Sequence, residues 1–158
     1  MEQYPVSAAW LSLEGFEAES FETLAKLAIG ELTLLGRAGI VCGPISTGGC
    51  GSAEDNFLVF NRTIISLQDE GFPIFSQIPY ESGIGKLRQA WNDAGNSGYC
   101  MPILHEFYAP LFRTGLITCA WFIPGWESSF GARWEREECK KLGIKTCDLD
   151  PGWIKSLL

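Results

Sequence analysis

The chain alternates between two patterns of apolar residues. Short runs that are almost wholly apolar are typical of strands buried on both faces of a sheet, and they occupy residues 40–42, 72–78, 116–123 and 144–149. Longer segments with apolar residues at helical spacing lie beside these runs, at 16–35, 55–70, 84–91, 102–113 and 129–142. Alternating strands and helices predict an α/β fold: a parallel sheet of four to five strands with helices on both faces, of flavodoxin-like or Rossmann-like type.

Two of the predicted helices have a clear inward face. In the segment 55–70 that face consists of Phe57, Phe60, Ile64 and Leu67. In the segment 129–142, which Ser128 or Ser129 can cap, it consists of Ala132, Glu135, Cys139 and Leu142. Glu135 is the one carboxylate on that face, and a buried charge without a partner is costly. It therefore requires either an arginine partner, such as Arg133 or Arg136, or a chemical role.

Length and charge narrow the class of protein. A chain of 158 residues has about the length of one domain. The pattern predicts a single α/β domain over residues 38–158, preceded by a helical extension over 1–37. The net charge of −7 opposes binding to nucleic acid or to an anionic membrane. No apolar run reaches the roughly 18 residues that span a bilayer, and the acidic N-terminus lacks a signal-peptide core. We expect a cytoplasmic protein with neither nucleic-acid nor membrane partners.

Six cysteines raise the question of zinc or disulfides. No two of them form a CxxC pair, and the chain has a single histidine, so the pattern disfavours a structural zinc site. Cys42, Cys119 and Cys147 lie in strand-like runs, where buried free thiols are common. Free thiols are typical of an intracellular protein. The sequence therefore predicts no disulfide, no metal and no cofactor.

A glycine-rich loop over residues 43–52 follows the first predicted strand. It lacks the lysine of a Walker A loop, the G-x-G-x-x-G of a dinucleotide site, the cysteine–arginine spacing of a phosphatase loop and the G-x-S-x-G of a hydrolase elbow. What remains is either a plain connection or a loop whose backbone N–H groups hold a phosphate or a sugar. Ligands bind beyond the carboxyl ends of parallel strands, and that rule brings this loop together with residues 76–81 and 124–131.

Short motifs stand in a fixed order between about residues 38 and 149. The first strand ends in Gly43-Pro44-Ile45-Ser46, and Asn56 and Phe60 follow on the next helix. Leu67, Gly71 and a strand ending near Gln77-Ile78-Pro79 come next, and the last predicted long helix carries Ser129, Gly131 and Glu135. In this order and spacing the chain resembles the nucleoside 2-deoxyribosyltransferase superfamily, most closely its small nucleotide N-glycosidases and their uncharacterised relatives.

This resemblance implies cleavage of the N-glycosidic bond of a nucleoside or a nucleoside 5′-monophosphate. Glu135 would attack the anomeric carbon and the base would leave. Water or a second base would then resolve the glycosyl-enzyme ester, by the logic of retaining glycosidases. Substrate-binding roles would fall to Gly43, Ser46, Gly48, Gln77, Glu106, Tyr108, Ser129 and Gly131. Family members commonly complete the site from a neighbouring subunit, so the resemblance also implies a homo-oligomer of two or more subunits.

The resemblance leaves three points open. Hydrolysis and base transfer share the same first step, so either can be the reaction. The arginine that binds phosphate in the monophosphate hydrolases is absent from residues 45–49, so the need for a 5′-phosphate is open. The alternative function is a catalytically silent nucleotide-binding or interaction module of the same fold.

Overall fold

The computed structural model describes residues 20–45 and 48–158. The described residues group into two compact units: a helical unit of 20–36 and 77–116, and a sheet unit of 37–76 and 117–158. All four strands, and Glu135, belong to the sheet unit. The division into an extension over 1–37 and a domain over 38–158 stays a prediction.

The sheet unit is built on four parallel strands in the order β2-β1-β3-β4. They are β1 (Ala38–Cys42), β2 (Ile74–Phe75), β3 (Ile117–Phe122) and β4 (Lys145–Asp148). The predicted α/β fold with a parallel sheet is thus confirmed, and the strand order is that of flavodoxin-like proteins. Every residue of β1 is buried, as expected of a central strand covered on both faces, whereas β4 is an edge strand.

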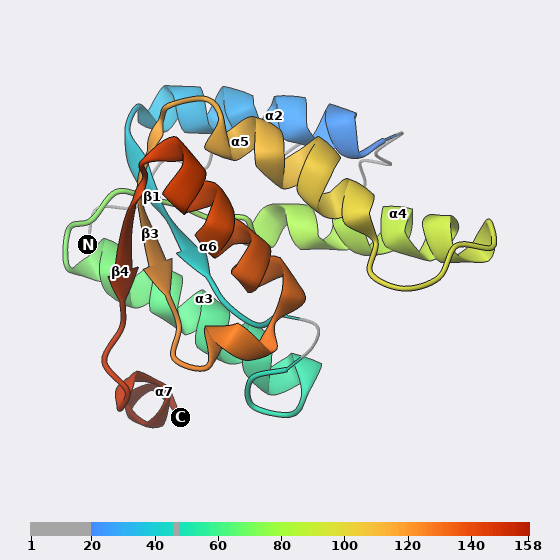
Figure 1. The fold of residues 1–158 in the computed structure, drawn as a ribbon. Coiled ribbons are helices and arrows are strands. Elements are labelled where there is room, and N and C mark those ends of the chain that lie inside the picture. The colour runs from blue at the N-terminus through green and yellow to red at the C-terminus, as the bar shows by residue number, and fades with distance from the viewer. Residues whose placement is uncertain (1–19, 46–47) are drawn as a thin grey trace. The chain divides into compact units, whose positions relative to one another are not determined.

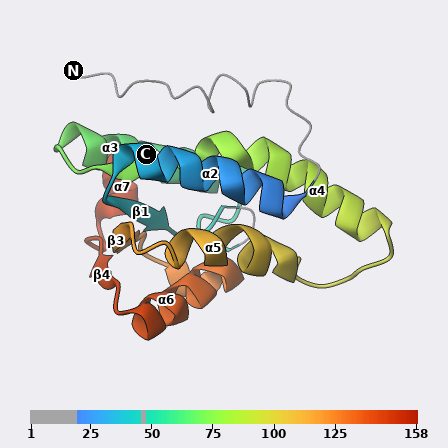
Figure 2. The same ribbon diagram turned by 90° about the horizontal axis from the view of Figure 1, so that it is seen from above.

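Two helices cover opposite faces of this sheet. Helix α3 (Ala53–Asp69) lies on one face and α6 (Phe130–Leu142) on the other (Figure 1, Figure 2). A short C-terminal helix, α7 (Trp153–Leu157), packs on α3, where Trp153 Nε1 donates to Thr63 Oγ1 at 2.9 Å. Helices α3 and α6 each connect two parallel strands, as crossover connections in a parallel sheet require.

The ends of α3 and α6 follow from their sequences. Ser52 Oγ accepts from Asp55 N–H at 3.1 Å, and Ser129 Oγ accepts from Ala132 N–H at 3.2 Å. Each serine satisfies a donor that the first helical turn leaves open, so Ser129 is the N-cap of α6. That helix ends at Gly143, whose φ of 70° is left-handed and accessible to glycine without strain.

The helical unit contains α2 (Phe21–Leu35), α4 (Glu81–Asp93) and a π-helical stretch, η2 (Ile103–Tyr108), that continues into α5 (Ala109–Phe112). Helix α2 packs against η2, α5 and α4. The Tyr80 hydroxyl, just before α4, donates to Glu31 Oε2 of α2 at 2.6 Å. The predicted helix at 102–113 is therefore present. Pro110, which has no N–H to donate, lies inside it, directly after the π-helical stretch in which the Ala109 N–H bonds to Leu104 O.

Four predicted details are wrong. Glu135 is not the one inward carboxylate of α6, because Glu138 is also buried, with 5% of its surface exposed. The strand expected over 72–78 spans only β2, and Gln77 instead precedes a 3₁₀ turn, η1 (Ile78–Tyr80); prolines at 73 and 79 cannot donate to a strand ladder. Phe57, assigned to the inward face of α3, is 40% exposed, and Asn56 is buried instead. Leu142, assigned to the inward face of α6, is 42% exposed in the last turn of the helix.

Candidate functional site

The strand order creates a topological switch point between β1 and β3. The chain leaves β1 towards α3 on one face of the sheet and leaves β3 towards α6 on the other (Figure 2). Loops that diverge in this way leave the carboxyl ends of the two strands open between them, and parallel sheets bind their ligands there. We call this edge the switch-point rim, defined by residues 42–45, 48–51 and 123–129.

Asn56 of α3 holds the glycine-rich loop after β1. Its side chain is 3% exposed. The Oδ1 atom accepts from Cys50 N–H at 2.8 Å, and Nδ2 donates to Gly48 O at 2.9 Å. One buried amide thus fixes the turn from Gly48 to Cys50 in the second half of the loop.

Ser128 joins that loop to the turn after β3, η3 (Trp126–Ser128). Its Oγ accepts from Gly49 N–H at 2.8 Å and donates to Gly125 O at 2.7 Å. The two loops approach closely, because a Cβ atom on Gly48 would lie 2.5 Å from Ser128 Oγ. Gly48 also has a φ of 72°, which residues with a side chain rarely adopt. The contact between the loops therefore requires glycine at position 48.

Glu135 is buried close to the same edge. Its side chain is 7% exposed, and the Cys42 thiol donates to its Oε2 at 3.3 Å. Because Cys42 is the last residue of β1, this contact puts the carboxylate at the carboxyl end of the central strand. Burial, and then the neighbouring charge of Glu135, raise the pKa of the Cys42 thiol well above its usual value. The thiol therefore stays protonated and remains a hydrogen-bond donor to the carboxylate.

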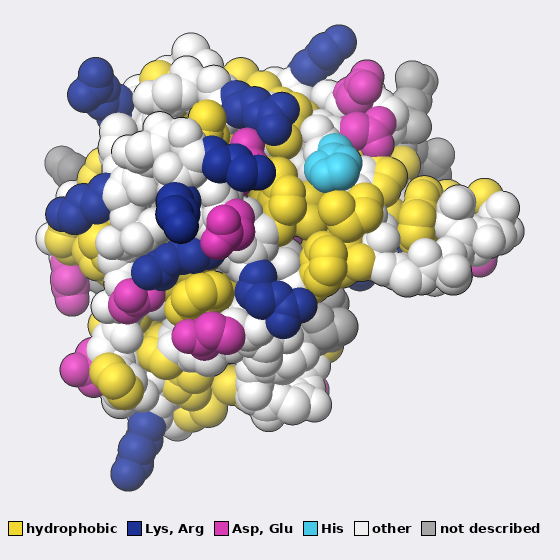
Figure 3. All heavy atoms as spheres, viewed as in Figure 1, with side chains coloured by type: hydrophobic (Ala, Val, Ile, Leu, Met, Phe, Trp, Pro, Cys, Tyr) yellow, Lys and Arg dark blue, Asp and Glu magenta, His cyan; other side chains and the backbone are white. Residues whose placement is uncertain are grey.

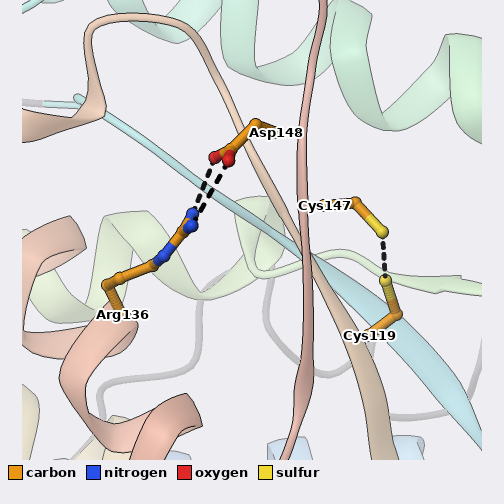
Figure 4. A network of polar contacts seen from close by, with 4 residues as sticks. All are labelled: Cys119, Arg136, Cys147 and Asp148. Carbon is orange, nitrogen blue, oxygen red and sulfur yellow. Dashed lines mark hydrogen bonds and ion pairs between the residues drawn. The ribbon is translucent and has the colours of Figure 1, made fainter.

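The two arginines nearest to Glu135 in sequence bond to other groups. Arg136 pairs with Asp148 through Nη1–Oδ1 at 2.7 Å and Nη2–Oδ2 at 3.3 Å (Figure 4). That hydrogen-bonded pairing lowers the pKa of the Asp148 carboxyl. Arg133 Nη1 donates to Glu127 O at 3.0 Å. Arg133 and Arg136 therefore bond to other groups, and the interpretation that Glu135 pairs with an arginine from elsewhere in the chain stays a prediction.

The residues expected at the site fall into three groups. The sheet unit contains Gly43, Gly48, Ser129, Gly131 and Glu135. The helical unit contains Gln77, Glu106 and Tyr108, whose part in the site stays a prediction. Ser46 lies outside the described residues.

Two of the sheet-unit residues, Gly43 and Ser129, also have a role in the packing or hydrogen bonding of the fold. Gly43 is buried, and a Cβ atom there would lie 3.0 Å from Ile123 Cβ, so β1 and β3 can meet closely only with glycine at this position. Ser129 Oγ already accepts the Ala132 N–H, although its own hydroxyl proton remains available to a ligand oxygen. Substrate contacts from these two residues stay predictions.

Two residues at the rim were not predicted from the sequence. Cys42 was assigned to a buried strand, and the contact with Glu135 joins residues 93 positions apart. For Ser128 the sequence indicates only a helix cap. The signal that could have found Ser128 is the adjacent pair Gly48-Gly49, since paired glycines often mark the close approach of another backbone.

The surface around α6 carries both signs of charge. Basic and acidic side chains are mixed on this face in the space-filling view (Figure 3).

Within residues 20–45 and 48–158, no group of three or more His, Cys, Asp or Glu side chains is arranged to hold a metal ion. None of the helices in that part of the chain has the length and apolar character needed to cross a membrane.

Comparison with known proteins identifies no relative. No protein-family model, no curated protein and no solved structure matches this chain. The function is therefore inferred from the chemistry of the switch-point rim and from the resemblance of its motifs.

Proposed function

We propose that the protein cleaves the N-glycosidic bond of a nucleoside or nucleoside 5′-monophosphate, by hydrolysis or by transfer to a second base, with Glu135 as the nucleophile. One observation carries the proposal: a carboxylate that is 7% exposed lies 3.3 Å from the Cys42 thiol at the end of β1. A buried charge at a ligand-binding edge is unfavourable for stability, and such charges are concentrated at catalytic sites. The motif of Ser129, Gly131 and Glu135 supports the same assignment.

The chemistry requires a carboxylate that first stabilises and then bonds to an oxocarbenium-like anomeric carbon. A carboxylate oxygen of Glu135 attacks this carbon, and the base departs with the electron pair of the glycosidic bond and takes up a proton. The resulting ester is opened by water in hydrolysis or by a second base in transfer. The Cys42 thiol, which donates to Oε2, helps to hold the orientation of the carboxylate during the attack.

The described part of the glycine-rich loop, residues 48–51, favours a substrate without a phosphate at this position. The N–H groups of Gly49, Cys50 and Gly51 donate to Ser128 Oγ, Asn56 Oδ1 and Gly48 O, so the protein already uses these three donors. The net charge of −7 also repels a phosphate dianion. We therefore expect a nucleoside to be cleaved faster than its 5′-monophosphate.

The test is incubation of the full chain with pooled ribo- and deoxyribonucleosides and their 5′-monophosphates. Chromatography measures free base and exchanged base, and mass spectrometry measures a pentosyl adduct on Glu135. Glu135→Gln should abolish both signals. Glu137→Gln is the matched control, because Glu137 lies on the same helix and is exposed, and it should keep wild-type activity.

Three outcomes decide the proposal. Release of base that depends on Glu135 but not on Glu137 supports it. Absence of base release and base exchange in the wild-type protein refutes it. If the wild-type protein also binds nucleotides in a thermal-shift assay without turning them over, the chain is instead a silent nucleotide-binding module.

A further inference from the structure

Two cysteine thiols are in contact between β3 and β4. The Sγ atoms of Cys119 and Cys147 lie 3.2 Å apart (Figure 4). Neither cysteine is in a disulfide, and both are half-buried rather than enclosed. Cys147 pairs in register with Trp121, two residues after Cys119. Because side chains two residues apart on a strand point to the same side, both thiols lie on one face of the sheet.

This face is not the one that carries the candidate nucleophile. Asp148, the residue after Cys147, points to the opposite side of β4 and pairs there with Arg136 of α6 (Figure 4). Glu135 also belongs to α6. The thiol pair is thus separated from the proposed site by the thickness of the sheet, and its chemistry does not depend on the proposed function.

We propose that Cys119 and Cys147 are a redox-active thiol pair that a low-molecular-weight disulfide, such as oxidised glutathione, converts into a disulfide bond. The sulfur atoms must approach from 3.2 Å to the roughly 2.05 Å of an S–S bond. That is a movement of about 1.2 Å. It requires rotation of the two side chains and, because the cysteines lie diagonally across the register of β3 and β4, a small shift of the edge strand. Cys147 lies on the edge strand, so the reagent can reach it from the open side of the sheet.

The reaction balances in two exchange steps. The Cys147 thiolate attacks one sulfur of the reagent, forming a mixed disulfide and releasing one thiolate, which takes up a proton. The Cys119 sulfur, losing its proton to solvent, then attacks the Cys147 sulfur and releases the second thiol. Two protein thiols lose two electrons and two protons, and one reagent disulfide becomes two thiols.

The positions of the two thiols set the order of these steps, and the environment of Cys119 agrees with that order. Burial and the hydrogen bond with Cys147 raise the pKa of Cys119 to about 12, although the nearby Lys145 ammonium opposes the shift. Cys119 is therefore protonated at neutral pH, and it lies on the inner strand β3, whereas Cys147 lies on the edge strand that the reagent reaches first. Cys119 serves as the resolving thiol, which acts at short range after Cys147 has reacted.

The bond would enclose the part of the chain that carries Glu135. Cys119 and Cys147 are 28 positions apart, and η3 and all of α6 lie between them. A cross-link that closes such a segment restricts the unfolded chain more than the folded one. The oxidised protein should therefore melt at a higher temperature than the reduced protein.

The test exposes the folded full chain to oxidised glutathione, blocks the remaining thiols and maps disulfides by mass spectrometry. The wild-type protein should lose two hydrogens and show a peptide pair that links Cys119 to Cys147, reversed by dithiothreitol. Cys119→Ser should stop at a glutathione adduct on Cys147. Cys147→Ser should give neither the bond nor a comparable adduct on Cys119. Cys119→Ala replaces Cys119→Ser if circular dichroism shows that the serine variant is unfolded.

Cys50 provides the matched control, because it is also half-buried and lies in the glycine-rich loop. Cys50→Ser should form the same bond as the wild-type protein. The proposal is overturned if glutathione modifies Cys50 while Cys119 and Cys147 stay reduced. It is equally overturned if the mapped bond joins other cysteines or if oxidation leaves the melting temperature unchanged.

Discussion

Removal of the Ser128 hydroxyl should separate the two loops that form the switch-point rim. In Ser128→Ala, Gly49 N–H loses its acceptor at 2.8 Å and Gly125 O loses its donor at 2.7 Å. Both hydrogen bonds are exposed to solvent, so water partly replaces them and each contributes about 0.5 kcal/mol, the lower end of the usual range. The summed loss is about 1 kcal/mol, which lowers Tm by roughly 2–4 °C in a chain of this size.

Two measurements test this prediction. Thermal unfolding gives the total loss, and amide hydrogen exchange gives its location. Exchange at the Gly49 amide should be faster in Ser128→Ala, whereas the Cys50 amide, which donates to Asn56, should keep its protection. Ser156→Ala is the matched control. Ser156 is also an exposed serine, its Oγ donates to Trp153 O, and it lies far from Ser128 in the sequence. This variant should not change exchange at Gly49.

One result would refute the reasoning about this contact. If Gly49 exchanges at the wild-type rate in Ser128→Ala, the serine does not join the loops in solution. A loss of stability without any change at Gly49 would place the effect of Ser128 in its bond to Gly125 alone.

Three further predictions follow from the same structure. Gly48→Ala should destabilise the protein more than Gly125→Ala in chemical denaturation. Both positions have positive φ, which costs alanine roughly 1–2 kcal/mol, but only at Gly48 would the new Cβ lie 2.5 Å from Ser128 Oγ. Equal losses of stability would contradict the close approach of the two loops. Glu135→Gln should leave the free energy of unfolding unchanged or raise it by up to about 1 kcal/mol, because it removes a buried charge and keeps an acceptor for the thiol; a large loss in urea denaturation would mean that the carboxylate is structural. Burial raises the pKa of Glu81 from 4.5 to about 7, so the wild-type protein loses stability as the pH rises through that interval. Glu81→Gln should therefore have a higher Tm than the wild-type protein at pH 8 but not at pH 4. The same difference in Tm at both pH values would contradict the raised pKa.

The fold was accessible from the sequence where local pattern is strong. The apolar runs and helical spacings predicted all four strands and both covering helices, and the Ser129 cap was one of two choices. Local pattern predicted burial less well for residues at the border between the buried and the exposed face of a helix. Phe57 is apolar and 40% exposed, whereas its polar neighbour Asn56 is buried, because the buried stripe of α3 begins at Asn56, whose amide bonds to the loop.

The candidate site was predicted only in part. Glu135 was singled out because a carboxylate interrupts an apolar helical face, which is a local signal. Its contact with Cys42 could not be predicted, because strand register and helix packing decide which atoms meet across 93 positions of sequence. The same holds for Ser128 and Gly49, which are 79 positions apart.

The sequence by itself determined the class of fold and the inward position of one carboxylate, because backbone periodicity and apolar spacing depend on neighbours within a few residues. Only the tertiary structure decided what that carboxylate touches, which loop amides are already bonded and which two of six thiols are in contact. The physical reason is that these contacts depend on the register of β1, β3 and β4 and on the packing of α6. A shift of one residue in a strand would turn Cys42, Cys119 or Cys147 to the other face of the sheet.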